Sequence, residues 1–306
     1  MFQYSLDNKR YHTLNFHYQQ VFGKKTFKVS LNAGFSCPNK VNGQGCIYCS
    51  NSGSGDFAGN VEDDLLVQFN KVKQMMELKW PDSYYIGYFQ ANTNTYAPLE
   101  ILKEKYEQIL NIPNVVGLSI GTRCDAITDE VLDYLAELNH RTHLTIELGL
   151  QSKHDKTLNL INRGHNLNDF EKMVKKLQQK KIEVVVHIIN GLPGETKEDM
   201  LETVKYLNHL KIDGIKIHML HIIEGTKLHE LFKEEPFPIL SKEEYIDIVI
   251  SQLEYLDPRI VIHRITGDPN AEELVEPIWL LKKFCLLNDI DKEMKKRNTY
   301  QGIMLK

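Results

Sequence analysis

The sequence lacks the features of a membrane protein or a disulfide-rich secreted protein. No apolar run in its 306 residues approaches the roughly 20 residues that a membrane span needs. Five cysteines are too few, and odd in number, for a disulfide framework. The first residues, Met1 to Tyr4, lack the charged and then apolar pattern of a secretory leader. We therefore expect a cytoplasmic protein with reduced thiols and no membrane contact.

The chain also lacks the excess positive charge that is typical of nucleic-acid-binding proteins. Its formal net charge is −4 and its pI is near 6.3. With 42% hydrophobic and 25% charged residues, it has the composition of an ordinary globular protein. Some stretches are locally basic, and they indicate either solvated helix faces or a phosphate-binding surface. They are residues 24–28, 172–181, 282–283 and 292–297.

Short β-branched or aromatic runs alternate with amphipathic patterns along the first two thirds of the chain. Strands are predicted at 28–32, 84–89, 115–120, 143–148, 183–189 and 214–219. Six strand–helix units in a row indicate a parallel sheet. No Gly-x-Gly-x-x-Gly turn or Walker loop follows any of these strands, which disfavours an open nucleotide-binding sheet. We predict an α/β fold, a partial (β/α)6 barrel.

Three parts are expected along the chain. They are an N-terminal extension at 1–22, the barrel at 23–225, and an α-rich C-terminal extension at 226–306 that packs on the barrel. Helices between the strands are predicted at 61–78, 99–110 and 129–138. The C-terminal extension is predicted to hold a helix at 241–256, a strand at 259–265 and a long helical pattern at 276–297. Helix starts are predicted at Thr128, at Thr196, and at Ser241 with Glu244 in a capping box.

Three cysteines lie close together in the sequence. Cys37, Cys46 and Cys49 have the spacing Cys-x8-Cys-x2-Cys and directly follow the first predicted strand. Three thiolates can hold three corners of a four-iron cluster and leave the fourth iron open, and an open metal position is typical of a catalytic site. A zinc site completed by a histidine, or a chance spacing, remains an alternative. Cys124 and Cys285 are isolated, and we expect both to be buried.

Polar residues and glycines follow five of the predicted strands. They occupy residues 87–95, 119–125, 147–152, 187–194 and 216–221. The active sites of α/β barrels lie at the carboxyl ends of the strands, so we expect these segments to converge on one site.

Glu147 is the sharpest candidate in that set, because its strand is otherwise apolar. A buried carboxylate needs a partner. That partner is either a ligand hydroxyl or ammonium, or Arg123 or Arg163. His187, in a valine-rich strand, is either a satisfied core histidine or a site residue. Arg163 either holds a carboxylate with both guanidinium arms or ties down a loop.

Together these residues resemble the radical S-adenosylmethionine superfamily, although the cysteine spacing departs from its commonest Cys-x3-Cys-x2-Cys form. Some segments resemble the branch that holds the elongator catalytic subunit and the oxygen-independent coproporphyrinogen dehydrogenase. They are Asn162-Arg163-Gly164-His165, Gly191-Leu192-Pro193-Gly194 and Leu220 to Thr226. Others are similar to the bacterial tRNA-modifying MnmL family, over nearly the whole chain. They are Phe89 to Tyr96, Ile120 to Asp125 and Asn298 to Gly302.

The resemblance implies a [4Fe–4S] cluster on Cys37, Cys46 and Cys49, whose fourth iron binds the amino and carboxylate groups of S-adenosylmethionine. It also implies reductive cleavage of that cofactor to a 5′-deoxyadenosyl radical, which takes a hydrogen from the substrate. The resemblance also implies contacts to the cofactor. For the methionine ammonium they are Gln90, Asn92, Thr93 and Asn94, for ribose or ammonium Glu147 and Gln151, and for the carboxylate Arg163. Adenine would contact Tyr48, Leu220 and His221, and His187 is a further cofactor contact whose partner group is not specified.

The implied substrate is tRNA at the wobble uridine, where a 5-carboxymethylaminomethyl group would become aminomethyl. RNA binding needs phosphate contacts and an extruded base. The candidates for these contacts are the basic C-terminal helix with Lys24, Lys25, Lys28, His263 and Arg264. An electron donor such as flavodoxin or ferredoxin is expected, and DNA is not. Two alternatives stay open: the same radical chemistry on a small molecule such as a porphyrinogen, and a zinc-stabilised α/β binding module without catalysis.

Overall fold

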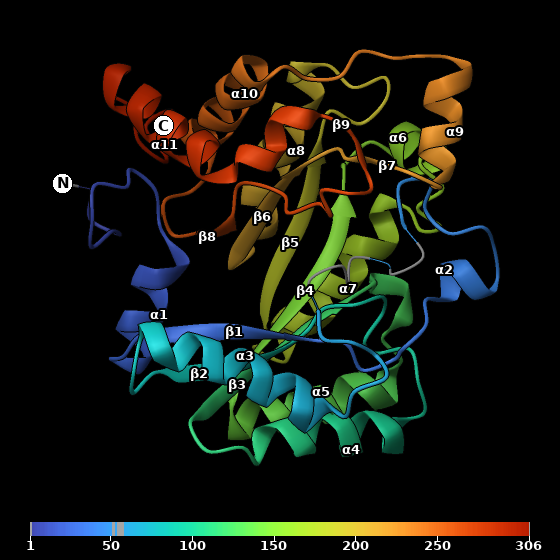
Figure 1. Cartoon of the computed structure of the whole chain (residues 1–306), viewed down its shortest axis with the longest axis vertical. Coiled ribbons are helices and arrows are strands. Elements are labelled where there is room, and N and C mark those ends of the chain that lie inside the picture. The colour runs from blue at the N-terminus through green and yellow to red at the C-terminus, as the bar shows by residue number, and fades with distance from the viewer. Residues whose placement is uncertain (1, 51–52, 54–57, 306) are drawn as a thin grey trace.

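A computed structural model describes residues 2–50, 53 and 58–305 (Figure 1). Within these residues the main sheet has seven parallel strands in the order β1-β2-β3-β4-β5-β6-β8. The strands are β1 (Thr26–Leu31), β2 (Tyr84–Phe89), β3 (Val115–Thr122), β4 (His143–Gln151), β5 (Glu183–Asn190), β6 (Gly214–Met219) and β8 (Val261–Arg264). The sheet curves into a half-barrel covered by helices, which confirms the predicted α/β partial barrel. The C-terminal extension supplies a seventh strand, β8, to the six that were predicted.

The helices cover the outside of the sheet and the C-terminal side of the molecule (Figure 1). They are α1 (Leu14–Phe22), α2 (Pro38–Val41), α3 (Leu65–Lys79), α4 (Leu99–Leu110), α5 (Asp129–Arg141), α6 (Asp155–Leu160), α7 (Leu167–Gln179), α8 (Lys197–Leu210), α9 (Lys227–Glu234), α10 (Lys242–Tyr255) and α11 (Lys283–Lys296). Short 3₁₀ turns span Cys124–Ala126 and Ile278–Lys282. A small antiparallel pair joins β7 (Ile222–Ile223) to β9 (Leu274–Glu276). In the described part of the chain, no helix is both long enough and apolar enough to cross a bilayer.

Side-chain caps fix several helix starts, as predicted. The Thr128 side chain accepts a hydrogen bond from the backbone of α5, and Thr196 and Ser241 each form a full capping box at α8 and α10. Two predicted boundaries are wrong. The helix predicted to begin at residue 61 begins at Leu65, because Asp64 caps it. The long pattern predicted at 276–297 is divided into the end of β9, a 3₁₀ turn and α11; Pro277, which lacks a backbone N–H, precedes that turn.

The strands present one apolar and one polar face, and the polar face forms the inside of the barrel. On β4, Leu144, Ile146 and Leu148 belong to the hydrophobic core shared with the helices. Successive side chains on a strand point to opposite faces. Glu147 therefore points to the barrel axis, where it meets side chains from β1, β5 and β6. A barrel lined in this way contains a polar cavity rather than a packed apolar core.

The first and last segments of the chain pack against each other (Figure 1). The backbone N–H of Gln301 donates to Arg10 O, and the His12 N–H donates to the Gln301 side chain over 2.7 Å. Thr13, at the start of α1, also forms a parallel bridge to Ile262 of β8. These contacts hold β8 at the edge of the sheet. This strand therefore borders the open side of the half-barrel.

Candidate active site

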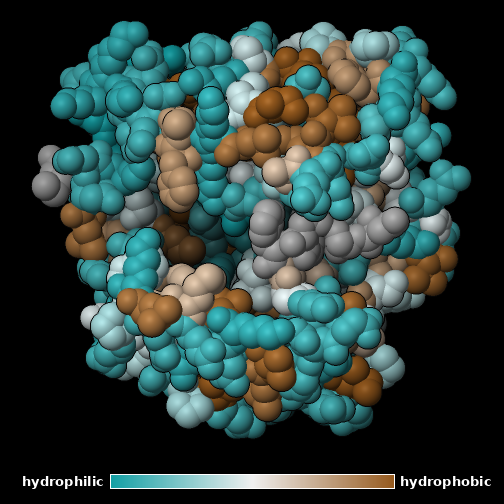
Figure 2. Space-filling view, in the orientation of Figure 1, coloured by the Kyte–Doolittle hydropathy of each residue, from teal (hydrophilic) through white to brown (hydrophobic). Residues whose placement is uncertain are grey.

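The carboxyl ends of the strands enclose a cavity of about 290 Å³. Figure 2 shows this face of the molecule hollowed between the half that carries α10 and α11 and the half that carries α3. Almost all of the predicted site residues line the cavity. They are Cys37, Cys46, Tyr48, Cys49, Gln90, Asn92, Thr93, Glu147, Gln151, Arg163, His187, Leu220 and His221. The predicted convergence of the strand exits on one site is therefore seen in the structure.

Asn94 is the predicted contact that lies outside this lining. It is fully buried, and its Nδ2 donates to Phe89 O over 3.1 Å and to Gly121 O over 2.8 Å. Asn94 thereby ties the end of β2 to the end of β3 and positions the loop that carries Asn92 and Thr93.

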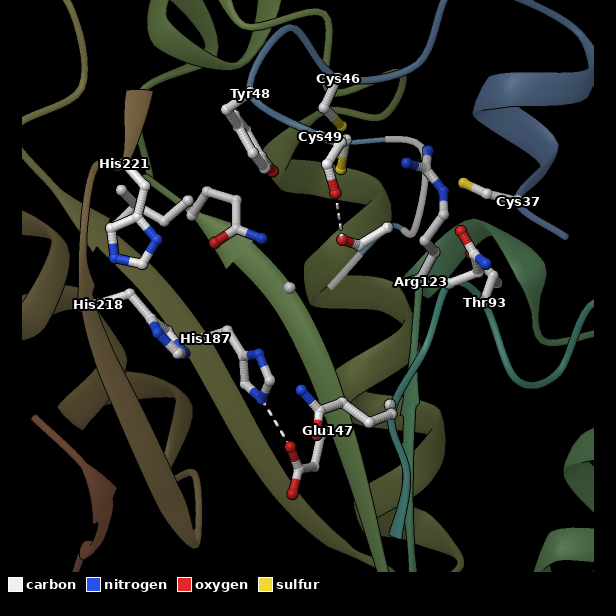
Figure 3. A pocket seen from close by; sticks show the side chains of 18 of the residues that line it. Cys37, Cys46, Tyr48, Cys49, Thr93, Arg123, Glu147, His187, His218 and His221 are labelled. Carbon is white, nitrogen blue, oxygen red and sulfur yellow. Dashed lines mark hydrogen bonds and ion pairs between the residues drawn. The ribbon is translucent and has the colours of Figure 1, made fainter. Parts of the chain in front are cut away.

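The three cysteines lie at one end of the cavity (Figure 3). Cys37 caps the short helix α2, and Cys46 and Cys49 sit in a loop closed by the bond from Cys49 N–H to Cys46 O. The Cys49 thiol lowers the pKa of Cys46 through a hydrogen bond; burial opposes that effect, and the charges of Arg163 and Arg123 add to it. The same hydrogen bond raises the pKa of Cys49 well above its usual range, so the two thiols share one proton, which a bound metal would displace.

The arrangement of these sulfurs does not fit a single zinc ion. Tetrahedral Zn–S bonds of about 2.3 Å place ligand sulfurs only about 3.8 Å apart. In the described part of the chain, His17, His143 and Glu183 form the one group of three potential metal ligands whose atoms all lie within 4.8 Å of one another. The three cysteines do not form such a group, so at least one pair of their sulfurs is more than 4.8 Å apart, which is wider than a preformed zinc site.

The other two cysteines lie apart from this loop. Cys124 is buried as predicted, and burial raises its pKa to about 12. Cys285 is exposed on α11, so its predicted burial is wrong. An amphipathic helix on the protein surface leaves one side in solvent, and the spacing of one isolated cysteine does not identify its side.

Three buried polar atoms in the cavity wall have no partner among the described residues. They are Arg123 Nη1, Gln151 Oε1 and His221 Nε2. Buried polar groups are almost always hydrogen-bonded, and leaving one unpaired costs about 1–3 kcal/mol. Gln151 also adopts a left-handed backbone conformation, with φ of 76°. The wall is therefore built to bind a ligand that carries both hydrogen-bond donors and acceptors.

Arg163 connects the cysteine loop to the end of β4. Its Nε and Nη2 donate to Gly149 O over 3.2 and 2.6 Å, and its Nη1 lies 3.7 Å from Cys46 Sγ. A side chain at Gly149 would displace the ends of two site residues, because a Cβ there would lie 2.6 Å from Gln151 Nε2 and 2.9 Å from Arg163 Nη2. The structure thus fixes the Arg163 guanidinium between a backbone carbonyl and a thiolate, with one face toward the cavity.

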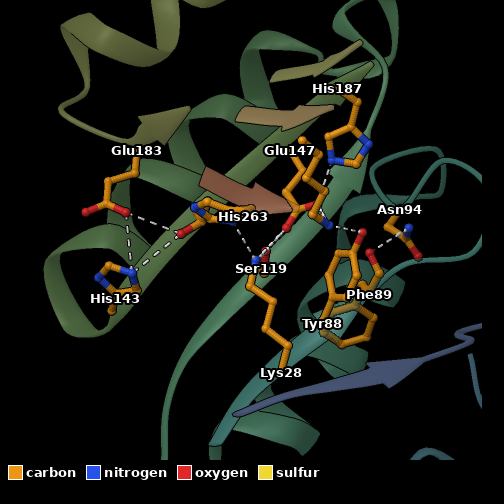
Figure 4. A network of polar contacts seen from close by, with 12 residues as sticks. Lys28, Tyr88, Phe89, Asn94, Ser119, His143, Glu147, Glu183, His187 and His263 are labelled. Atoms are coloured by element: carbon orange, nitrogen blue, oxygen red, sulfur yellow. Dashed lines mark hydrogen bonds and ion pairs between the residues drawn. The ribbon is translucent and has the colours of Figure 1, made fainter. Parts of the chain in front are cut away.

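Glu147 lies at the floor of the cavity, and its partners are not the predicted arginines (Figure 4). Its carboxylate accepts from Lys28 Nζ over 2.6 Å and from Lys216 Nζ over 2.5 Å. Ser119 Oγ donates to it over 2.6 Å, and His187 Nε2 lies 2.7 Å away. His187 is thus both a partner of Glu147 and part of the cavity wall.

The two predicted arginine partners of Glu147 are used elsewhere. Arg123 makes a bidentate ion pair with Asp125, its near neighbour in sequence. Arg163 reaches up to the cysteine loop. The sequence pattern predicted correctly that both arginines lie at the carboxyl ends of the strands. It did not predict that they contact Asp125 and the cysteine loop instead of Glu147.

The lysines at the floor share one carboxylate, and this affects their charge. Lysine ammonium groups, chiefly that of Lys216, keep the pKa of Glu147 well below its usual range although burial opposes them. Burial lowers the pKa of Lys216 to about 7; Glu147 counters this effect and Lys28 adds to it. The two pKa values thus fall for different reasons: burial lowers that of Lys216, and the lysine charges lower that of Glu147.

Sequence reasoning missed several residues of the site and misplaced others. Lys216 and Tyr88, whose hydroxyl accepts from Lys216 over 2.9 Å, lie in predicted strand-exit segments but were not singled out as site residues. The period-two pattern of β6 is the signal that could have placed Lys216 on the inner face. Lys28 and His263 were predicted as candidates for contacts to RNA, and this stays a prediction. Lys28 Nζ lies 3.3 Å from His263 Nδ1 inside the barrel.

The other predicted RNA-contacting lysines lie on the outside. Lys24 pairs with Asp82 over 2.8 Å. The Lys25 ammonium lies over the rings of Phe27 and Trp80.

Residues 32–207, more than half of the chain, match the Radical SAM superfamily, and residues 212–296 match the Radical_SAM C-terminal domain. The chain belongs to the Radical SAM superfamily. This radical SAM protein is 49% identical over 304 residues to the uncharacterised protein YtqA of Bacillus subtilis, with 98% of this chain and 94% of YtqA covered. It is 32% identical to YhcC of Escherichia coli, with coverage of 93% and 92%.

More distant relatives of this radical SAM protein carry functional names. A tRNA uridine(34) acetyltransferase of Methanocaldococcus infernus is 28% identical over 60% of this chain, but only 34% of that protein is covered. The solved structure of Elp3 from the same organism has a TM-score of 0.70 at 21% identity, with 90% of this chain and 64% of that chain covered. This likeness shows a shared fold. The resemblance to the superfamily is confirmed, and the finer resemblance to the MnmL family stays a prediction.

Proposed function

We propose that this radical SAM protein is a tRNA-modifying enzyme that holds a [4Fe–4S] cluster on Cys37, Cys46 and Cys49. This proposal rests on the three cysteines at the end of a polar cavity, whose sulfurs are too widely spaced for one zinc ion. When bound, the cluster and S-adenosylmethionine supply reductive cleavage to a 5′-deoxyadenosyl radical that removes a hydrogen atom from the substrate. A reduced flavodoxin or ferredoxin in the cytoplasm would supply the electron.

Residues of this chain would orient the cofactor along the cavity. Arg163 and the orphaned Nη1 of Arg123 lie near the cysteines and suit the methionine carboxylate. Gln151 Oε1 and His221 Nε2 are free to bond the ribose and adenine edges. Burial lowers the pKa of His221 to about 4, so the imidazole is neutral and its partnerless nitrogen can either donate or accept, depending on the tautomer. Gln90, Asn92, Thr93, Tyr48 and Leu220 complete the wall.

We further propose tRNA as the substrate, with the wobble uridine as the target base. A relative that matches over 60% of this chain is named for uridine 34 of tRNA, which supports the proposal. The reaction class is the conversion of a 5-carboxymethylaminomethyl group to aminomethyl, and it begins with hydrogen removal beside the amine. The resulting carbon radical would give one electron to an oxidised flavodoxin or ferredoxin, and water would hydrolyse the iminium so that the carboxymethyl carbons leave as glyoxylate. The cavity in the described part of the chain opens between two halves of the molecule, as an extruded base requires (Figure 2).

Anaerobic reconstitution followed by product analysis tests this function. Purified protein should bind about four irons, and 5′-deoxyadenosine should increase when bulk tRNA that carries the modified uridine is added. Nucleoside mass spectrometry should show carboxymethylaminomethyluridine decreasing as aminomethyluridine increases. A colourless protein with one zinc would contradict the cluster assignment. Turnover with a porphyrinogen but not with tRNA would contradict the substrate.

The cysteine variants sharpen this experiment. Cys46→Ala removes a buried ligand beside Arg163, and we expect loss of the brown colour, the iron and all 5′-deoxyadenosine. The matched control is Cys285→Ala, because Cys285 is exposed on α11 and far from the cavity lining. Equal iron content in the two variants would remove Cys46 from the ligand set.

A further inference from the structure

The end of the cavity opposite the cysteines is a cationic wall built from β6, β8 and the loop after β8. Arg264 and Asp268 line the cavity together with His218 and His221. Figure 3 shows the two histidines across the cavity from the cysteines. Lys216 lies directly beneath this wall, because its Cα pairs with that of Arg264 across the two parallel strands. This wall takes no part in the cofactor contacts proposed above, except for His221.

A local irregularity in β8 turns Arg264 into the cavity. Ile215 of β6 pairs with Ile262, but the next residue, Lys216, pairs with Arg264 rather than with His263. The extra residue is a bulge, which re-aims the side chains that follow it. His263 contacts Lys28 inside the barrel, and yet Arg264 also faces inward, which a regular strand would not allow.

Positive charge exceeds negative charge at this wall. Glu147 is shared by Lys28 and Lys216, and Asp268 is shared by Arg264 over 3.1 Å and Lys283 over 2.7 Å. Two carboxylates thus face three cationic side chains and Lys216, whose pKa of about 7 leaves it partly charged at neutral pH.

The histidines around the wall do not change this balance. Burial lowers the pKa of His187 and of His221 to about 4 and that of His218 well below its usual range, so all three are neutral at pH 7. The wall therefore favours an anion from the cavity side.

The loop after β8 holds the wall in place by close packing. At Gly267 an added Cβ would lie 2.1 Å from His221 Nε2, so the backbone between Arg264 and Asp268 passes directly over the imidazole. Asp268 fixes one side of the Arg264 guanidinium. Since an arginine presents several donors in a planar fork, the side toward the cavity can take a carboxylate.

We propose that Arg264, supported by Lys216, binds the carboxylate of the substrate side chain and so selects carboxymethylated uridine. This inference rests on the proposed function. It assigns recognition of the substrate to the C-terminal segment, at the opposite end of the cavity from Arg163. The aminomethyl product has no carboxylate, so it loses this contact and dissociates more readily. Losing a charge-assisted pair of hydrogen bonds corresponds to about a 10- to 100-fold weaker affinity.

The test compares the affinity of reconstituted protein for two anticodon stem-loops, without reductant so that no turnover occurs. One stem-loop carries carboxymethylaminomethyluridine and the other carries aminomethyluridine. The wild type should bind the first at least 10-fold more tightly. Arg264→Gln should lower this ratio to near 1, and Arg264→Lys should keep part of it. Lys216→Met, which removes the supporting charge, should lower the ratio to an intermediate value.

A matched control and the possible outcomes separate this inference from the proposed function. Arg259→Gln changes an exposed arginine that pairs with Asp257 outside the cavity lining, and it should keep the full ratio. If tRNA stimulates 5′-deoxyadenosine formation but Arg264→Gln keeps the wild-type ratio, the inference fails alone. The same holds if the wild type shows no preference. If tRNA gives no stimulation, the proposed function fails and the inference with it.

Discussion

Glu147→Gln is the substitution with the largest expected effect on stability at the floor of the cavity. The glutamine keeps the shape of the side chain but removes the charge shared by the ammonium groups of Lys28 and Lys216, which lie 2.6 and 2.5 Å away. Removing one partner of a buried ion pair typically costs about 3–5 kcal/mol. Lys216 keeps the Tyr88 hydroxyl and Lys28 keeps the Ser119 hydroxyl as acceptors. We therefore expect a loss of about 3 kcal/mol, the lower end of that range.

The pH dependence of this loss follows from the pKa of Glu147. Lysine charges, led by Lys216, hold that pKa well below its ordinary value in the folded protein, against the effect of burial. A carboxyl whose folded pKa is depressed contributes stability that is fully present above the unfolded pKa of about 4.3 and is lost as the pH falls through the folded pKa. The contribution of the Glu147 charge should therefore shrink below about pH 4. Because Glu147 also raises the pKa of Lys216, which is about 7 in the folded protein, the difference between wild type and Glu147→Gln should be smaller above pH 7 than below it.

Urea unfolding of cluster-free protein under nitrogen, followed by circular dichroism, measures the effect. The control is Glu202→Gln, because Glu202 pairs with Lys153 at the surface of α8 and should leave the urea midpoint almost unchanged. Adding Lys216→Met to Glu147→Gln should restore part of the loss by removing one unpaired cation. If Glu147→Gln unfolds at the same urea concentration as the control, the ion-paired floor described above is wrong.

Two further substitutions test other parts of the structure. Gly149→Ala places a methyl group 2.6 Å from Gln151 Nε2 and 2.9 Å from Arg163 Nη2. It should weaken S-adenosylmethionine binding about 10-fold in equilibrium dialysis while the iron content stays at the wild-type value. Thr196→Ala removes the side-chain acceptor for the Asp199 N–H at the start of α8. It should cost about 1 kcal/mol in urea unfolding, and an unchanged midpoint would show that this cap contributes nothing.

Local patterns predicted most of the fold because they act over a few residues. The six barrel strands lie where apolar and β-branched runs were found, and the helices begin at Thr128, Thr196 and Ser241 because side chains there satisfy backbone N–H groups. The convergence of the polar residues that follow the strands was also predictable from the sequence. Parallel strands share one carboxyl edge, so polar exits converge whatever the curvature of the sheet.

The contacts of Glu147 were not predictable from these patterns. Alternation indicates which face of a strand a side chain occupies, but not which side chains from other strands lie at the same height inside a closed or partly closed barrel. Lys28 and Lys216 are 188 positions apart and meet only because the sheet curves. The bulge at His263 has no sequence signal of its own, so the inward direction of Arg264 could not be inferred either.

The negative net charge of the chain is compatible with the cationic side chains inside its barrel. The net charge acts on molecules at long range, whereas the side chains inside the barrel act on a ligand in the cavity. A net charge of −4 governs solubility and long-range association. The charged groups that line the cavity include Arg123, Arg163 and Arg264, while Lys28 and Lys216 pair with Glu147 at its floor. Lys28 and His263, which were predicted as candidates for contacts to RNA phosphates, contact each other inside the barrel. If the proposed tRNA substrate is correct, contacts to the RNA backbone should come from the surface around the mouth of the cavity, and the interior should recognise the charge of the modified base.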